Sequence, residues 1–129
     1  MYIQAVDATV SPLQFFPSTV SVSPKDQRRY AARFPRSTVR YMNWELNLRY
    51  PPRSARTTFS IREVWIKPDG SVDHESNNVS GYADAGWTNS YHSAGWGNTN
   101  GGHWQRGSYR VDLFVDNRKV VTGQFEIID

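Results

Sequence analysis

A stretch rich in glycine and tryptophan, residues 86–107, holds most of the side chains that could bind a ligand or a partner. It contains six of the nine glycines, and its candidate contact residues are Trp87, Tyr91, His92, Trp96 and Trp104. Flat indole faces beside amide and hydroxyl groups suit a sugar, whereas Trp, Tyr and Arg are also the usual anchors of protein interfaces. A third interpretation is structural, with the tryptophans filling the open end of the fold and fixing a long loop. We rank the structural interpretation first, a protein interface second and a sugar or other small ligand third.

A basic run is the second candidate surface. Arg28, Arg29 and Arg33 are its leading residues, and Tyr30 and Phe34 are interleaved with them. Cations mixed with aromatic rings can follow a phosphate backbone and stack on bases. The net charge of +3 is well short of a nucleic-acid-binding face, however. We therefore expect a solvated loop, or one paired with acids elsewhere, and we do not expect nucleic acid as the partner.

Residues for catalysis or metal binding form no recognisable motif. Ser90, His92 and Asp84 could in principle form a triad, since triads are defined by geometry and not by sequence order. No nucleophile elbow, phosphate-binding loop or dinucleotide fingerprint accompanies them. His74 and His103 lack the spacing of zinc ligands, and the chain contains no cysteine. We expect no catalytic activity, no metal and no cofactor.

Alternation of apolar and polar residues predicts the elements that must position these side chains. In the strand expected over 38–50, one parity is apolar and the other is polar. The apolar set is Met42, Trp44, Leu46, Leu48 and Tyr50, and the polar set is Asn43, Glu45, Asn47 and Arg49. A second strand is expected over 57–67, with a bulge near Arg62 and Glu63 because the inward parity changes there.

Turn signals and further alternation complete the expected elements. Pro68-Asp69-Gly70 predicts a turn, followed by a strand from Val72 to about His74 that pairs back. Alternation over 109–115 and 121–127 around a tight turn at 116–119 predicts a hairpin. Residues 5–16 read as an edge strand interrupted at Pro12. Residues 23–36 should form a loop with at most one or two helical turns.

These elements predict an all-β fold in which two sheets cover each other. No helix long enough to lie across a sheet is expected, so the fold class is an all-β, antiparallel two-sheet β-sandwich, with a small barrel as the alternative. The 129 residues suffice for one domain, spanning 1–129. No apolar run is long enough to span a membrane, and the first residues lack the pattern of a leader peptide. We favour a cytoplasmic location.

The end of the chain resembles known modules. Trp104, Gly107, Tyr109 and Val111 give the pattern W-x-x-G-x-Y-x-V, and the following strand ends in G-x-F-x-I. This run resembles the last two strands of immunoglobulin-like and fibronectin-III-like modules, and is similar to accessory modules of bacterial multidomain proteins. The resemblance implies that the sandwich is of the immunoglobulin-like type, that Tyr109 is a tyrosine corner and that Trp44 is the core tryptophan. It also implies a non-catalytic role, without naming a ligand.

We therefore expect a binding or structural module that acts in protein–protein interaction or scaffolding within a larger bacterial protein or assembly. The alternative is a carbohydrate-binding module that uses the tryptophans of residues 86–107. The edge strand expected near residues 6–16 could also pair with a second copy of the chain and form a homo-oligomer.

Overall fold

The computed structural model describes residues 2–19 and 25–129 as ten strands and two short 3-10 turns. The elements are β1 (Tyr2–Ile3), η1 (Gln4–Val6), β2 (Ala8–Val10), β3 (Gln14–Ser18), η2 (Lys25–Gln27), β4 (Arg33–Pro35), β5 (Tyr41–Arg49), β6 (Thr57–Ile66), β7 (Val72–Ala83), β8 (Asn89–Gly97), β9 (Gly107–Val115) and β10 (Arg118–Ile128).

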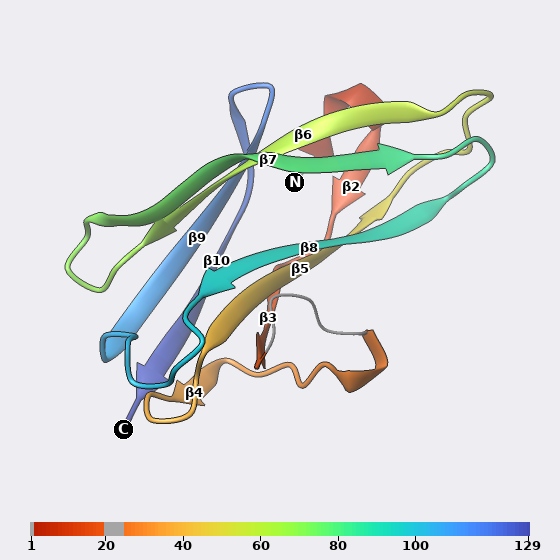
Figure 1. Ribbon diagram of the computed structural model, residues 1–129. Helices are drawn as coiled ribbons and strands as arrows, with labels where there is room; N and C mark the ends of the chain where they lie inside the picture. Colours follow the sequence, from red (N-terminus) through yellow and green to blue (C-terminus); the bar gives the residue numbers. More distant parts are fainter. Residues whose placement is uncertain (1, 20–24) are drawn as a thin grey trace.

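The strands form two sheets that share one core, as Figure 1 shows. In the first sheet β5 is central, because β2 and β3 pair with one side of it and β8 with the other, while β1 extends the sheet beyond β2. The second sheet has the order β4-β10-β9-β6-β7, and only β4 runs parallel to its neighbour. The prediction of an all-β, antiparallel, two-sheet immunoglobulin-like sandwich is confirmed.

The central strand β5 follows its predicted alternation on one face only. Trp44 is fully buried, as are the other apolar residues of its parity within the strand. The prediction that the other face of the strand is exposed to solvent is wrong for two residues, because Asn43 and Glu45 are buried as well. The segment that follows η2 covers that face, and Tyr30 and Arg28 contact the Glu45 carboxylate there.

The bulge predicted on β6 near Arg62 and Glu63 lies instead on the partner strand. Between the pairs Ile61–Val79 and Glu63–Ser76 the register shifts by one residue, and the extra residue belongs to β7. The expected change of inward parity in β6 is wrong, because Ile61, Glu63 and Trp65 share one parity and are all buried, while Val64 of the other parity is buried as well.

The Glu63 carboxylate accepts hydrogen bonds from the indole N–H of Trp44 at 3.2 Å and of Trp65 at 2.6 Å. One carboxylate thus satisfies the polar side-chain atoms of two buried tryptophans, one from each sheet.

The predicted turns and the C-terminal hairpin are confirmed. Gly70 adopts a positive φ of 91°, and the Asp69 carboxylate accepts bonds from the main-chain N–H and the hydroxyl of Ser71. Strand β7 follows and runs well beyond His74, which the alternation marked as its end. Asp116 and Asn117 both have positive φ and form the turn between β9 and β10.

The tyrosine corner at Tyr109 is also confirmed. Its hydroxyl accepts a hydrogen bond from the main-chain N–H of Gln105 at 2.9 Å. Its ring stacks on Phe125 with an interplanar angle of 5°, and Trp104 packs against both rings. The corner therefore fixes the loop before β9 onto the core.

The N-terminal part and the basic segment differ in detail from expectation. Pro12 interrupts the first segment as predicted, but β2 is flanked by β1 and β5, so it has no free edge. Of the expected loop at 23–36, residues 23 and 24 lie outside the described residues. The remainder contains one 3-10 turn and a short strand, β4, that the alternation did not indicate.

Candidate functional site

The glycine- and tryptophan-rich stretch is not the single loop that we expected. Residues 89–97 form β8, a regular strand that pairs with β5 along its whole length. Pairing requires glycine here, because a Cβ at Gly95 would lie 2.2 Å from the Asn43 side-chain oxygen and 2.3 Å from the Met42 carbonyl oxygen. The glycines that suggested a flexible loop thus allow close approach of two strands.

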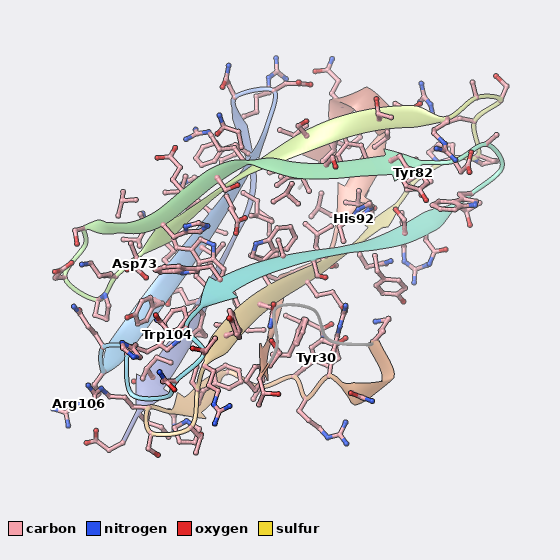
Figure 2. All side chains as sticks on the ribbon, in the orientation of Figure 1. Tyr30, Asp73, Tyr82, His92, Trp104 and Arg106 are labelled. Carbon is pink, nitrogen blue, oxygen red and sulfur yellow. The ribbon has the colours of Figure 1, made fainter. Side chains whose placement is uncertain are left out.

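The three tryptophans of the stretch differ in how far they are exposed. Trp104 is only 3% exposed, lies in the core and donates its indole N–H to the Arg40 carbonyl. Trp96 is partly buried, with the His74 ring stacked on it at 4.7 Å. Trp87, at 40% exposed, is the one that presents a large surface to solvent. The Trp96 ring packs against Trp104 at 5.9 Å, whereas Trp87 packs against Tyr82. Figure 2 shows Trp104 and Tyr82 toward opposite ends of the sandwich, so Trp87 lies apart from the other two.

An aromatic strip, defined here as Tyr82, Trp87 and Tyr91, lies where β7 passes into β8. The three side chains are 42%, 40% and 53% exposed. The Tyr82 and Trp87 rings are 5.4 Å apart and tilted by 33°, and the Arg56 guanidinium lies 4.4 Å from the Tyr82 ring centre. Large aromatic side chains that remain this exposed do not serve the core of the protein.

Neighbouring loops hold the strip in place. Arg56 pairs with Asp84 at 3.0 Å, and this ion pair together with the Ala85 N–H lowers the pKa of the Asp84 carboxyl. The Trp87 N–H donates to the Asp84 carbonyl, and the Gly86 N–H donates to the Arg53 carbonyl. The turn that carries Trp87 is therefore tied to the loop before β6.

An open groove of about 580 Å³ lies along residues 86–91, with Trp87 and Tyr91 among its lining residues. Gly86, Thr88, Asn89 and Ser90 line the rest of it. The groove combines two aromatic side chains with hydroxyl and amide groups.

A buried carboxylate with three donors lies beside Tyr91. Glu45 accepts from the Tyr30 hydroxyl at 2.8 Å, from Lys25 at 3.2 Å and from Arg28. Burial opposes ionisation of Glu45, but these donors outweigh it and lower the pKa of the carboxyl. The Lys25 ammonium also lies 4.0 Å from the Tyr91 ring centre, which links this cluster to the aromatic strip.

The basic run does not form an open cationic surface. Arg28 pairs with Glu45, and Arg33 pairs with Glu126 at 3.1 Å. Arg36 donates to the Trp104 carbonyl. Arg29 is exposed and donates to the Arg28 carbonyl. Most of these cations hold the segment to the sandwich, which agrees with the expectation that they pair with acids elsewhere.

Two members of the imagined triad do meet. The Ser90 hydroxyl and His92 Nε2 are 2.7 Å apart, and burial lowers the pKa of the His92 imidazole. Asp84, in contrast, is bonded to Arg56 and Ala85. The His92 ring packs against Phe59 and beneath Gly81, so the pair faces the interior of the sandwich.

Within residues 2–19 and 25–129, no group of three or more His, Asp or Glu side chains is placed to hold a metal ion. In the same ranges no helix is long and apolar enough to cross a membrane.

Sequence reasoning missed Arg56, Tyr82 and Glu45. Tyr82 and Arg56 are 26 positions apart, and the antiparallel pairing of β6 with β7 brings them together, with Thr58 opposite Tyr82. The sequence did contain one signal for Tyr82. It is an aromatic residue at a solvent-facing position near the end of a strand, and a turn that contains Gly86 follows it.

Comparisons with known proteins give the fold and no closer relationship. No family model matches the chain, and no curated protein matches it. A solved alkylpurine DNA glycosylase of Pseudomonas fluorescens, bound to DNA with an abasic-site analogue, is similar over 98% of this chain and 32% of its own, with a TM-score of 0.62 and 11% identity. A β-glucosidase of Listeria innocua is similar over 94% of this chain and 16% of its own, with a TM-score of 0.51 and 9% identity. An immunoglobulin-like protein of Pseudomonas aeruginosa aligns over 97% of this chain and 99% of its own, with a TM-score of 0.49 and 10% identity. The chain thus spans about a third of the glycosylase and about a sixth of the glucosidase.

Proposed function

We propose that this chain is a non-catalytic binding module that contacts a protein partner through the aromatic strip. The observation that carries the proposal is the exposed stack of Arg56, Tyr82 and Trp87. Aromatic side chains and arginine supply most of the binding energy at protein interfaces. Each ring here is already held by a neighbour, so little side-chain entropy is lost on binding.

The charge around the strip suits a partner with acidic groups. Arg49 and Arg53 are exposed, and within the described part of the chain neither forms an ion pair. Asp84 is already neutralised by Arg56. A partner surface that places carboxylates next to an apolar or aromatic group would complement both the cations and the rings.

The similar regions of two solved proteins are parts of much longer chains, which supports an accessory role for this chain. In both the glycosylase and the glucosidase, the matching region is a minor part of a longer chain. We propose that this chain likewise acts in or beside a larger protein, as expected for the accessory modules of bacterial proteins that its last two strands resemble. Its partner would then be another domain or subunit of that assembly.

Carbohydrate binding is the second candidate, and the groove along residues 86–91 favours it. Trp87 and Tyr91 offer ring faces, and Asn89 and Thr88 offer polar groups between them. Only one of the five tryptophans is largely exposed, whereas the carbohydrate hypothesis expected two. A sugar would therefore have to use a tyrosine as its second stacking surface.

Site-specific photo-crosslinking tests the protein hypothesis. A benzoylphenylalanine at position 87 should crosslink to a defined protein in the source cells, and the adduct should disappear when Tyr82→Ala and Arg56→Ala are added. The matched control places the same group at Val72, which is 54% exposed and begins β7, whereas Tyr82 lies near the other end of that strand.

The outcomes separate the two candidates. Equal adducts at positions 87 and 72, or none at 87, would contradict a protein partner at the strip. A glycan array that gives a signal lost in Trp87→Ala would replace the protein hypothesis with the carbohydrate one.

A further inference from the structure

Three of the four sheet edges carry features that prevent pairing with another chain. β4 has three residues and includes Pro35, and β7 has two register shifts and carries Asp73 and Glu75. On the far side of β5, β3 contains Pro17 and is bridged to Ala31, and β1 has only two residues. Prolines, bulges, charges and short length all discourage the addition of a foreign strand.

The fourth edge, β8, lacks these features. Its nine residues, Asn-Ser-Tyr-His-Ser-Ala-Gly-Trp-Gly, contain no Asp, Glu, Lys, Arg or Pro, and its pairing with β5 has no register shift. Within the described part of the chain its other flank is hydrogen-bonded to no strand, and Figure 1 shows it as the outer strand of its sheet. It is a long, regular, uncharged edge.

The hydrogen bonds at its two ends show which main-chain groups face outward. The Tyr50 N–H donates to the Thr88 carbonyl, and the Asn98 N–H donates to the Arg40 carbonyl. Even-numbered residues of this strand therefore direct their main-chain groups toward β5. In an antiparallel ladder the alternate residues point the other way, so the N–H and C=O groups of Tyr91, Ser93 and Gly95 are directed to the open edge.

We infer that β8 pairs antiparallel with β8 of a second copy of this chain, with Ser93 on the two-fold axis. This register places Tyr91 of each copy opposite Gly95 of the other, and the outward groups of Ser93 opposite their own counterparts. A tyrosine beside a cross-strand glycine covers the backbone that the glycine leaves exposed. Gly95 is exposed here, and Tyr91 is the most exposed residue of the aromatic strip.

Self-pairing suits this edge because β8 has no charged side chain that would face the same side chain of the second copy. A charged residue near a two-fold axis meets its own copy, and like charges directly opposite each other are destabilising. β8 has none, whereas the same symmetry applied to β7 would bring Asp73 and Glu75 together with other carboxylates. Tyr91 of the aromatic strip lies in the paired segment, but the stack of Arg56, Tyr82 and Trp87 that carries the proposed function lies outside it. The inference therefore goes beyond the proposed function and does not depend on it.

Molecular mass in solution is the first test. Sedimentation equilibrium of the unmodified chain should give twice the monomer mass of 14.8 kDa. Ser93→Pro should give the monomer, since its lost N–H points away from β5 and the β5–β8 ladder stays intact. Ser93→Lys should act in the same direction, while Gln124→Lys on the exposed face of β10 should leave the dimer unchanged.

A crosslink tests the register and does not depend on how the proline variant folds. The chain has no cysteine, so Ser93→Cys introduces a single thiol. Two residues that face each other as a hydrogen-bonded pair lie about 5.5 Å apart between Cα atoms, which a disulfide can span. Mild oxidation should convert this variant to a covalent dimer, at least about tenfold faster than Ser80→Cys on β7. A monomeric mass at millimolar concentration, or equal crosslinking rates for the two variants, would overturn the inference.

Discussion

Replacing Glu45 by Gln should reveal how strongly the segment after η2 is held to the first sheet. The Glu45 side chain is 2% exposed and accepts bonds from Tyr30, Arg28 and Lys25. A hydrogen bond to a charged group contributes about 1.5–3 kcal/mol when buried. The contribution of Lys25 is smaller, about 0–1 kcal/mol, because that side chain is half exposed.

Glutamine keeps the shape and one acceptor oxygen but removes the charge. The Arg28 guanidinium is 14% exposed, so the variant removes a negative charge from beside a largely buried cation. We expect a loss of about 2–4 kcal/mol in the free energy of unfolding at pH 7, measured by urea denaturation. Glu75→Gln is the matched control, because its partner Arg62 is partly exposed, and it should cost less than about 1 kcal/mol.

The pH dependence makes the test sharper. The pKa of Glu45 is lower in the folded chain than its ordinary value of 4.5. The carboxylate therefore contributes its full stabilisation above that value, and the contribution is lost as the pH falls through the folded-state pKa. The difference between the unmodified chain and Glu45→Gln should be largest near pH 7 and should shrink below about pH 4. A difference below about 0.5 kcal/mol at pH 7, or one equal at pH 7 and pH 3, would refute this account.

Three further outcomes follow from the buried polar groups. Glu63→Leu should destabilise the chain by about 3 kcal/mol and alter the near-ultraviolet circular dichroism, since two indole N–H groups lose their acceptor; Glu63→Gln should cost less. Tyr109→Phe should lower the free energy of unfolding by about 1–2 kcal/mol in urea, because the Gln105 N–H is left unpaired. His92 has a folded-state pKa below its ordinary value of 6.5, so its protonation destabilises the fold as the pH falls below 6.5. His92→Gln should flatten the decline in melting temperature between pH 6.5 and 5.

The sequence predicted the sandwich and many of its details because apolar alternation and turn chemistry are local signals. The burial of Trp44, the turn at Gly70 and the corner at Tyr109 all follow from residues within a few positions of each other, whereas the bulge predicted on β6 lies on its partner β7. The site was predicted less well. Residues 86–107 were interpreted by composition, and composition does not distinguish glycines of a loop from glycines such as Gly95 that let strands approach.

The burial of Glu45 could not be read from its own strand. Its parity marks a solvent-facing position, and only a segment 15–20 residues earlier, through Lys25, Arg28 and Tyr30, makes that position internal. The same holds for the stack of Arg56 on Tyr82, which depends on the register of β6 against β7. Non-local pairing, rather than residue type, decided where these groups lie.

The uneven burial of the five tryptophans gives the chain two independent optical reporters. Trp44, Trp65 and Trp104 are shielded from water, so their emission should lie at short wavelength and resist quenching by iodide. Trp87 is open to the solvent and should emit further to the red and be quenched readily. Binding of a partner near Trp87 can therefore be followed at the long-wavelength side of the tryptophan emission. Unfolding of the core can be followed at the short-wavelength side in the same unlabelled sample.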